Sequence, residues 1–282
     1  MHLKRLTEFE ELSLPVLSSV RMSAFDITVL QYFTAYGLPV LSIVSFMLLI
    51  ARNLSLIRSW ILSRAISSFD ASYESCLVDH KKSLFLPLHD IVSSDWKLRN
   101  KGCIRIVEIG FRTGENIKYY PKNSHLVVVD RNVYIHAYLN SNPGLTSKVN
   151  IERVILSSED RLEAIPDSSV DAVVATFVLC SVTRINLILS EIKRILAPGG
   201  LYLYLEHCPD PRDTFLYKMQ NFLTTTKLWP MIFDGCHLNR NALQEIKLAQ
   251  FSDMNYQYVM IDSEHNKFSK LMRIHVIGTA VK

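Results

Sequence analysis

Two glycines and two acids stand where apolar segments end in the middle of the chain. The segment Ile104–Ile109 runs into the turn Glu108-Ile109-Gly110-Phe111-Arg112-Thr113-Gly114. Glycines in such a turn permit a sharp bend and let backbone N–H groups approach a ligand. Asp130 ends the next apolar segment, where a carboxylate can accept hydrogen bonds from both hydroxyls of a ribose. The pattern predicts a site for a nucleoside-containing cofactor, with ordinary turn glycines and a helix-capping Asp130 as the alternative.

The residues of the same turn bear on which cofactor is bound. Dinucleotides are held by Gly-x-Gly-x-x-Gly, with the pyrophosphate on a helix N-terminus. Here Arg112 and Glu115 occupy the second and third glycine positions, and a carboxylate at Glu115 would repel a pyrophosphate. S-adenosyl-L-methionine has no phosphate and carries a sulfonium cation, so nearby acids favour it. We therefore expect S-adenosyl-L-methionine, and the acids of Ser158-Glu159-Asp160 fit a nucleoside site as well.

Alternating apolar segments and helical patterns must position these residues. The firmest helix, Asn186 to Leu196, has an apolar face and is stopped by Pro198-Gly199-Gly200. This alternation predicts an α/β fold, a doubly wound, mostly parallel, Rossmann-like sheet of seven strands with helices on both faces. The five strands expected to be parallel are Ile104–Ile109, His125–Asp130, Ile151–Leu156, Val170–Thr176 and Leu201–Leu205.

The last third of the chain is expected to complete the sheet differently. Helices are predicted over Thr214–Lys227, with Pro230 ending the helical region, and over Asn241–Gln250. Two further strands, Tyr256–Ile261 and Arg273–Val281, have no helix between them, which predicts an antiparallel hairpin at the sheet edge.

An uncharged apolar segment near the N-terminus has the length of a membrane anchor. Residues 27–51 contain no charged side chain, and about 20 such residues cross a bilayer as a helix. Arg52, Arg58 and Arg64 follow the segment, which predicts that the C-terminal part faces the cytosol. Gly37 and Pro39 leave a second arrangement open, a hairpin that returns to the same membrane face. A cleaved signal peptide fits poorly because no small-residue cleavage site follows.

Composition limits the other classes of function. A net charge of +4 on 282 residues, with scattered Lys and Arg, gives no reason to expect nucleic acid as a partner. The five cysteines are widely spaced and form no C-x-x-C pair, so no metal site is expected. Residues 70–100 are interpreted as helix, broken at Pro87 and packing on the edge of the main domain.

Several motifs, in order, carry a resemblance to class I S-adenosylmethionine-dependent methyltransferases. Within that class, the N-terminal anchor and the Leu-Cys-Ser-Val and Asp-Gly-Cys pieces resemble the membrane-bound thiol S-methyltransferases of the methyltransferase-like seven type. The motifs are Val107–Gly114, Val170–Val174, Val178–Val182, Arg194–Gly200 and Phe233–Cys236.

The resemblance implies methyl transfer to the sulfur of small lipophilic thiols by a protein of the endoplasmic reticulum membrane or of lipid droplets. The resemblance runs from about Lys81 to Lys282, and the anchor matches in kind only. Together with the patterns above, this predicts a tail (1–26), a membrane anchor (27–51), a linker with packing helices (52–100) and a methyltransferase domain (101–282). The resemblance also implies cofactor-binding roles, which fall in three groups. Glu108, Gly110 and Gly114 would shape the methionine end, Asp130 the ribose site, and Glu159, Asp160 and Thr176 the adenine end and floor.

The chain departs from that family at Arg112, where the family has glycine, and at Phe111, where it has a small residue. Arginine adds a long side chain and disfavours positive φ. Arg112 either grips the carboxylate of the cofactor or fills the pocket. In the second case the chain would be a catalytically impaired scaffold at a membrane or lipid droplet.

On the acceptor side, His207 after the fifth strand is the candidate base for a thiol proton, and Asp234 is the second candidate. The alternatives are a satisfied histidine at a strand end and a plain Asp-Gly turn. Cys180 and Cys236 are interpreted first as packing residues, with lining of the acceptor pocket as the alternative. The apolar helix around Phe222 is expected to cover the substrate, or to be core or to rest on a membrane.

Overall fold

The structure, a computed structural model, describes residues 23–122, 124–157, 162–261 and 269–282. It divides into two compact units, Met1–Ser59 and Trp60–Lys282. Glu159 and Asp160 lie outside the described residues.

The N-terminal unit is helical from Ala24 onward. Helix α1 (Ala24–Tyr32) begins at a capping box formed by Ser23 and Asp26, and is followed by the π-helical turn η1 (Phe33–Gly37) and by α2 (Leu38–Phe85). The helical path therefore continues through Gly37 and Pro39 without the reversal that a hairpin needs. Residues Phe25–Ile50 contain an 18-residue window with a mean hydropathy of 2.0 and are long and apolar enough to cross a membrane. This helix is compatible with membrane anchoring.

A seven-stranded sheet organises the second unit, in the order β3-β2-β1-β4-β5-β7-β6. Neighbouring strands from β3 to β5 are parallel, and β7 runs antiparallel to both β5 and β6. The predicted doubly wound, mostly parallel sheet with its C-terminal antiparallel hairpin is confirmed. The strands are β1 (Arg105–Ile109), β2 (His125–Asp130), β3 (Asn150–Leu156), β4 (Val170–Thr176), β5 (Leu196–Cys208), β6 (Asp253–Met260) and β7 (Ile274–Val281).

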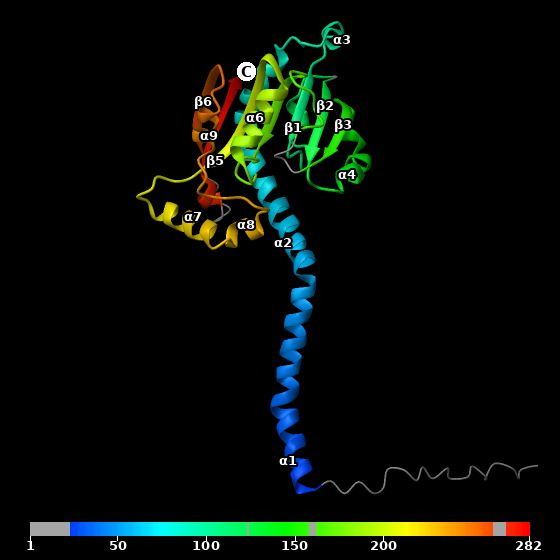
Figure 1. Cartoon of the computed structure of the whole chain (residues 1–282), viewed down its shortest axis with the longest axis vertical. Coiled ribbons are helices and arrows are strands. Elements are labelled where there is room, and N and C mark those ends of the chain that lie inside the picture. Colours follow the sequence, from blue (N-terminus) through cyan, green and yellow to red (C-terminus); the bar gives the residue numbers. More distant parts are fainter. Residues whose placement is uncertain (1–22, 123, 158–161, 262–268) are drawn as a thin grey trace, which may run out of the picture. The chain divides into compact units, whose positions relative to one another are not determined.

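Helices cover both faces of this sheet because its central strands are apolar on both sides. One face packs against α6 (Ile185–Ile195) and α9 (Ala242–Leu248), and Figure 1 shows α6 lying over the sheet. The other face packs against the C-terminal end of α2, against α4 (Ile135–Ser141) and against Trp229 of α8. The remaining helices are η2 (Leu86–His89), α3 (Trp96–Arg99), η3 (Ile117–Tyr119), α5 (Pro143–Thr146), α7 (Phe215–Thr225), α8 (Leu228–Ile232) and η4 (Ser269–Met272).

Several predicted boundaries were wrong. The fifth strand runs from Leu196 to Cys208 rather than from Leu201 to Leu205, and β7 pairs with its second half, so His207 lies within the strand. The helix predicted over residues 70–100 does break before Pro87, but residues 90–95 are not helical and only the short α3 follows them. The helical break after α7 falls at Lys227, whose φ is 60°, and Pro230 lies inside α8.

Candidate functional site

The turn after β1 has a left-handed backbone at three positions. Gly110, Arg112 and Gly114 have φ angles of 70°, 52° and 71°. A Cβ at Gly114 would lie 2.6 Å from the Phe111 ring, so this glycine is required by packing as well as by its φ angle. Over residues 110–122 the regular structure is limited to the three-residue η3. The turn therefore offers backbone N–H groups but lacks the long helix N-terminus that seats a pyrophosphate.

Asp130 ends β2 beside this turn and holds it. Its Oδ2 accepts a hydrogen bond from the backbone N–H of Arg112 at 2.8 Å, and its Oδ1 accepts one from the backbone N–H of Asn132 at 2.8 Å. A carboxylate oxygen has two lone-pair directions, so each oxygen can accept one more donor. The position and the acceptor capacity suit the two hydroxyls of a ribose.

Glu108 is the buried acid of the site, with 1% of its surface exposed at the end of β1. Asn116 donates through Nδ2 to Glu108 at 2.8 Å and to the hydroxyl of Thr176 at 3.0 Å, so it joins the ends of β1 and β4. Burial raises the pKa of Glu108 to about 7, although the hydrogen bond from Asn116 favours the ionised form. A nearby cation would convert this carboxyl to the ionised form.

The side chain of Arg112 is exposed. It does not pack into the domain core, although its backbone adopts the conformation that glycine would take more readily. The exposed side chain belongs to the same turn as Gly110 and Gly114.

The next part of the carboxyl edge, at the ends of β4 and β5, is fixed by a second buried acid. Glu206 accepts hydrogen bonds from the backbone N–H groups of Val178 at 2.7 Å and Leu179 at 2.8 Å. Burial raises the pKa of Glu206 to about 7, although these two bonds favour ionisation. The contact holds the turn that carries Cys180, immediately after β4.

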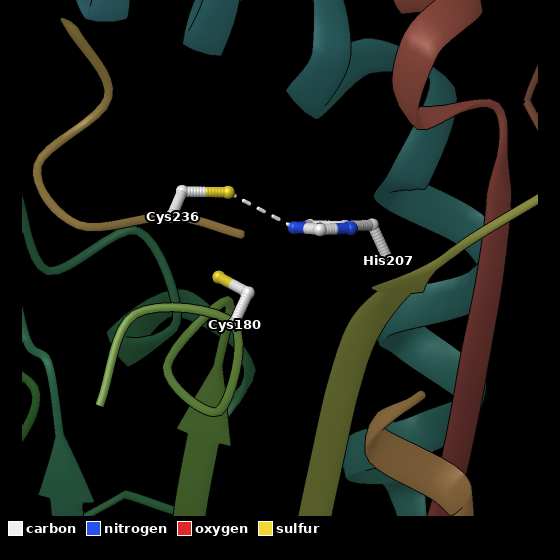
Figure 2. Close-up of side chains that lie close together, drawn as sticks. All are labelled: Cys180, His207 and Cys236. Carbon is white, nitrogen blue, oxygen red and sulfur yellow. Dashed lines mark hydrogen bonds between the residues drawn. The ribbon is translucent and has the colours of Figure 1, made fainter. Parts of the chain in front are cut away.

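Cys180, His207 and Cys236 meet at this edge. Figure 2 shows their side chains pointing towards one another from the turn after β4, from β5 and from the loop after α8. Nε2 of His207 lies 3.1 Å from Sγ of Cys236, and the ligand atoms of all three residues lie within 4.8 Å of one another. All three side chains are buried.

Protonation in this cluster is shared among the three groups. The hydrogen bond with Cys236, together with burial, raises the pKa of Cys180 well above its usual range. Burial alone would lower the pKa of His207, but its contact with Cys180 raises it overall. The predicted base His207 is therefore a buried member of a thiol cluster rather than an isolated imidazole.

Asp234, the second candidate base, forms an ion pair at the end of β2. Its carboxylate pairs with Arg131, which directly follows Asp130, and its backbone carbonyl accepts a second bond from Arg131 at 2.7 Å. Asp234 thus ties the loop after α8 to the end of β2. Gly235, with φ of 86°, completes the turn that delivers Cys236 to His207.

Helices α7 and α8 lie at the end of the sheet to which the arrowheads of the parallel strands point (Figure 1). Gln220 anchors α7 by donating to the backbone carbonyl of Leu271 at 2.8 Å and accepting from the backbone N–H of Asp210 at 2.9 Å. Five large apolar side chains of α7 and α8 are exposed: Phe215, Phe222, Leu228, Met231 and Ile232. An apolar cover therefore borders the edge at which the site residues lie.

The structure brings together most of the site residues that the sequence singled out. Glu108, Gly110, Arg112, Gly114, Asp130 and Thr176 lie at the carboxyl ends of β1, β2 and β4. Asn116, Glu206 and Arg131 were not anticipated. An asparagine six residues after a predicted ligand-binding glycine gives little signal, whereas Glu206, a charged residue in an apolar strand, was a signal that could have been used.

Comparison with known proteins gives consistent results. Residues 107–204 match the family model of a methyltransferase domain. Human thiol S-methyltransferase TMT1A is 30% identical over 214 residues, which cover 76% of this chain and 83% of that protein. Rat thiol S-methyltransferase TMT1B is 32% identical over 203 residues, covering 72% and 78%. A chain from the solved complex of the Haloferax volcanii Trm112 methyltransferase activator and a putative methyltransferase shares the fold, with a TM-score of 0.54 at 11% identity, covering 79% of this chain and 96% of that one.

Proposed function

We propose that this chain, which belongs to the family of the thiol S-methyltransferases TMT1A and TMT1B, transfers a methyl group to the sulfur of a small lipophilic thiol. Its cofactor is S-adenosyl-L-methionine. One observation carries the proposal. The ends of β1 and β2 hold the groups that suit this cofactor, and the ends of β4 and β5, directly beside them in the sheet, hold a buried thiol and imidazole cluster.

The donor set fits the cofactor group by group. Asp130 has acceptor capacity for a ribose diol, and Glu108 supplies a buried carboxyl that a sulfonium or ammonium cation would ionise. Gly110 and Gly114 leave the turn open to the backbone approach that the methionine end requires, and Thr176 forms the floor. Glu159 and Asp160 keep their proposed place at the adenine end.

Arg112 is assigned to the carboxylate of the cofactor. Its guanidinium is exposed on the turn that faces the ligand, and charge-assisted forks of this kind bind carboxylates in two-point fashion. The arginine that departs from the family pattern thus contributes to binding.

Methyl transfer is an in-line displacement, so the protein aligns sulfur, methyl and sulfonium and excludes water. Such orientation contributes up to about 7 to 11 kcal/mol to lowering a barrier. The acceptor sulfur approaches from the side of the Cys180–His207–Cys236 cluster, and the acceptor thiol loses its proton there. Asp234 acts by positioning Cys236 through its tie to Arg131.

The setting proposed for the reaction is a membrane surface. We infer that the helix Phe25–Ile50 anchors the chain, and the basic residues after it favour a catalytic domain that faces the cytosol. The proposed location is the endoplasmic reticulum membrane or lipid droplets. The exposed apolar side chains of α7 and α8 would admit lipophilic thiols from the membrane surface.

The proposal is tested with the full chain in detergent and S-adenosyl-L-methionine labelled in its methyl group. A long-chain alkane thiol, the matched alcohol and the matched amine are offered together. We expect label in the thioether alone, and strongly reduced transfer with Asp130→Ala. Label in the ether or the methylamine, or no transfer by a chain that binds the cofactor, would overturn the assignment.

A further inference from the structure

The Cys180–His207–Cys236 cluster has the composition and burial of a metal site. Two sulfur atoms and one imidazole nitrogen converge within 4.8 Å, and none of the three residues has more than 8% of its surface exposed. Thiolate and imidazole ligands together are typical of zinc. The three residues come from separate parts of the chain, so their spacing in the sequence does not indicate a metal site.

The surrounding structure holds these ligands in place. Glu206 fixes the turn of Cys180 through two backbone N–H groups, and the backbone N–H of His237 donates to the carbonyl of Cys180 at 2.9 Å. Arg240 donates to three carbonyls of the same turn, including that of Cys180 at 3.0 Å. A site held by such outer contacts is preorganised.

The distances suit a tetrahedral ion. With Zn–S of about 2.3 Å and Zn–N of about 2.0 Å, tetrahedral angles separate sulfur from nitrogen by about 3.5 Å and the two sulfurs by about 3.8 Å. The observed Nε2 to Sγ distance of 3.1 Å and the 4.8 Å limit for the whole cluster bracket these separations. Small side-chain rotations would accommodate the ion.

Charge balance also favours a divalent cation. Two thiolates around one divalent cation have no net charge, and binding drives the release of both protons.

We propose that Cys180, His207 and Cys236 bind one Zn²⁺ through Sγ, Nε2 and Sγ, with the fourth coordination position open to the acceptor thiol. The role of the fourth position rests on the proposed function. Three protein ligands with one open position are the arrangement of catalytic zinc sites, whereas structural sites have four.

The chemistry balances with this ion in place. The acceptor R–SH binds through sulfur and gives its proton to solvent, because the metal lowers the pKa of a bound thiol. A sulfur lone pair then forms the new S–CH₃ bond while the methyl–sulfonium bond of the cofactor breaks. The electrons of that bond remain on the sulfur of S-adenosylhomocysteine, and the neutral thioether, a weaker ligand than a thiolate, dissociates.

Metal content is the first test. The full chain, without a polyhistidine tag, is purified under reducing conditions in buffers free of chelators and analysed by mass spectrometry for metals. We expect about one equivalent of zinc, lost in Cys180→Ser and Cys236→Ser. Cys208→Ser is the matched control, because Cys208 is buried beside His207 on the same strand but packs on the other face of the sheet. It should retain the zinc.

Cobalt spectroscopy covers the case in which the serine variants fail to fold. Co²⁺ added to the metal-free wild-type chain should produce thiolate charge-transfer bands, together with the visible bands of tetrahedral cobalt, and an alkane thiol should shift them without any cofactor present. Absence of the bands, or a Cys180–Cys236 disulfide in the freshly reduced chain, would overturn the metal site. Bands that do not respond to thiol would overturn the open position.

Different results would overturn the zinc site and the proposed function. Thiol methylation by fully metal-free protein would overturn the zinc inference and leave the proposed function intact. Cobalt bands that respond to thiol in a chain that never forms thioether would overturn the proposed function and leave the zinc inference intact.

Discussion

Glu108→Gln is expected to reduce the pH dependence of both the folding stability and the cofactor affinity of this protein. The pKa of Glu108 is raised from 4.5 to about 7, mainly by burial. The folded chain therefore holds this proton at pH values at which the unfolded chain has lost it, and stability falls as pH rises through that window. Since each pKa unit corresponds to about 1.4 kcal/mol, the loss is about 3 kcal/mol between pH 4.5 and pH 7.

The same carboxyl should couple pH to cofactor affinity. A cation beside Glu108 favours its ionised form, so S-adenosyl-L-methionine binding should release a proton and weaken up to about tenfold for each pH unit below about 7. Calorimetric titrations from pH 5.5 to 8.5, in buffers of different ionisation enthalpy, measure the affinity and the proton release together. The Glu108→Gln chain should bind more weakly at pH 8 and show neither effect.

Glu206→Gln is the matched control, because Glu206 has a similarly raised pKa but caps the turn after β4 instead of facing the cofactor turn. It should alter the pH dependence of unfolding and leave the pH dependence of cofactor affinity in place. Equal pH dependence of cofactor binding in wild type and Glu108→Gln would refute the assignment of Glu108 to the cationic end of the cofactor.

Three further substitutions test the geometry of the site. Gly114→Ala should lower the free energy of unfolding by about 2 to 4 kcal/mol in denaturant titrations, because it adds a ring clash to a left-handed backbone. Gly102→Ala, with φ of 64° and open space around it, should lose only about 1 kcal/mol, and equal losses would contradict the clash. Asp234→Ala breaks an exposed ion pair with Arg131, so it should change the free energy of unfolding by less than about 1 kcal/mol. It should also raise the KM for thiol, and an unchanged KM would exclude a positioning role. Asp130→Asn should weaken cofactor binding by about 1 to 3 kcal/mol, and unchanged affinity would place the ribose elsewhere.

Local patterns predicted much of the fold. The central strands are short apolar runs bounded by turn residues, so the predicted bounds of β2 and β4 agree with the structure. The length of β5 was underestimated at both ends. Its first residues include Pro198-Gly199-Gly200, which was interpreted only as a helix stop, and its last residues, including Glu206 and His207, are polar and pair with β7. Tertiary pairing of this kind leaves no local pattern.

The site was only partly predictable for the same reason. Glu108 and Asp130 are found by their positions at strand ends, which a sequence displays directly. The meeting of Cys180, His207 and Cys236 depends on the sheet order and on a turn at Gly235, and neither appears in the spacing of the cysteines. The positive φ of Arg112 likewise depends on its backbone bond to Asp130.

We expect the cofactor to lie across β1 and β2 with its reactive end towards the thiol and imidazole cluster. A crystal or cryo-EM structure of the full chain with S-adenosylhomocysteine tests this directly. It should show the ribose hydroxyls on Asp130 and the thioether sulfur facing the cluster of Cys180, His207 and Cys236. A ribose bound away from Asp130, or a sulfur directed away from the cluster, would contradict it.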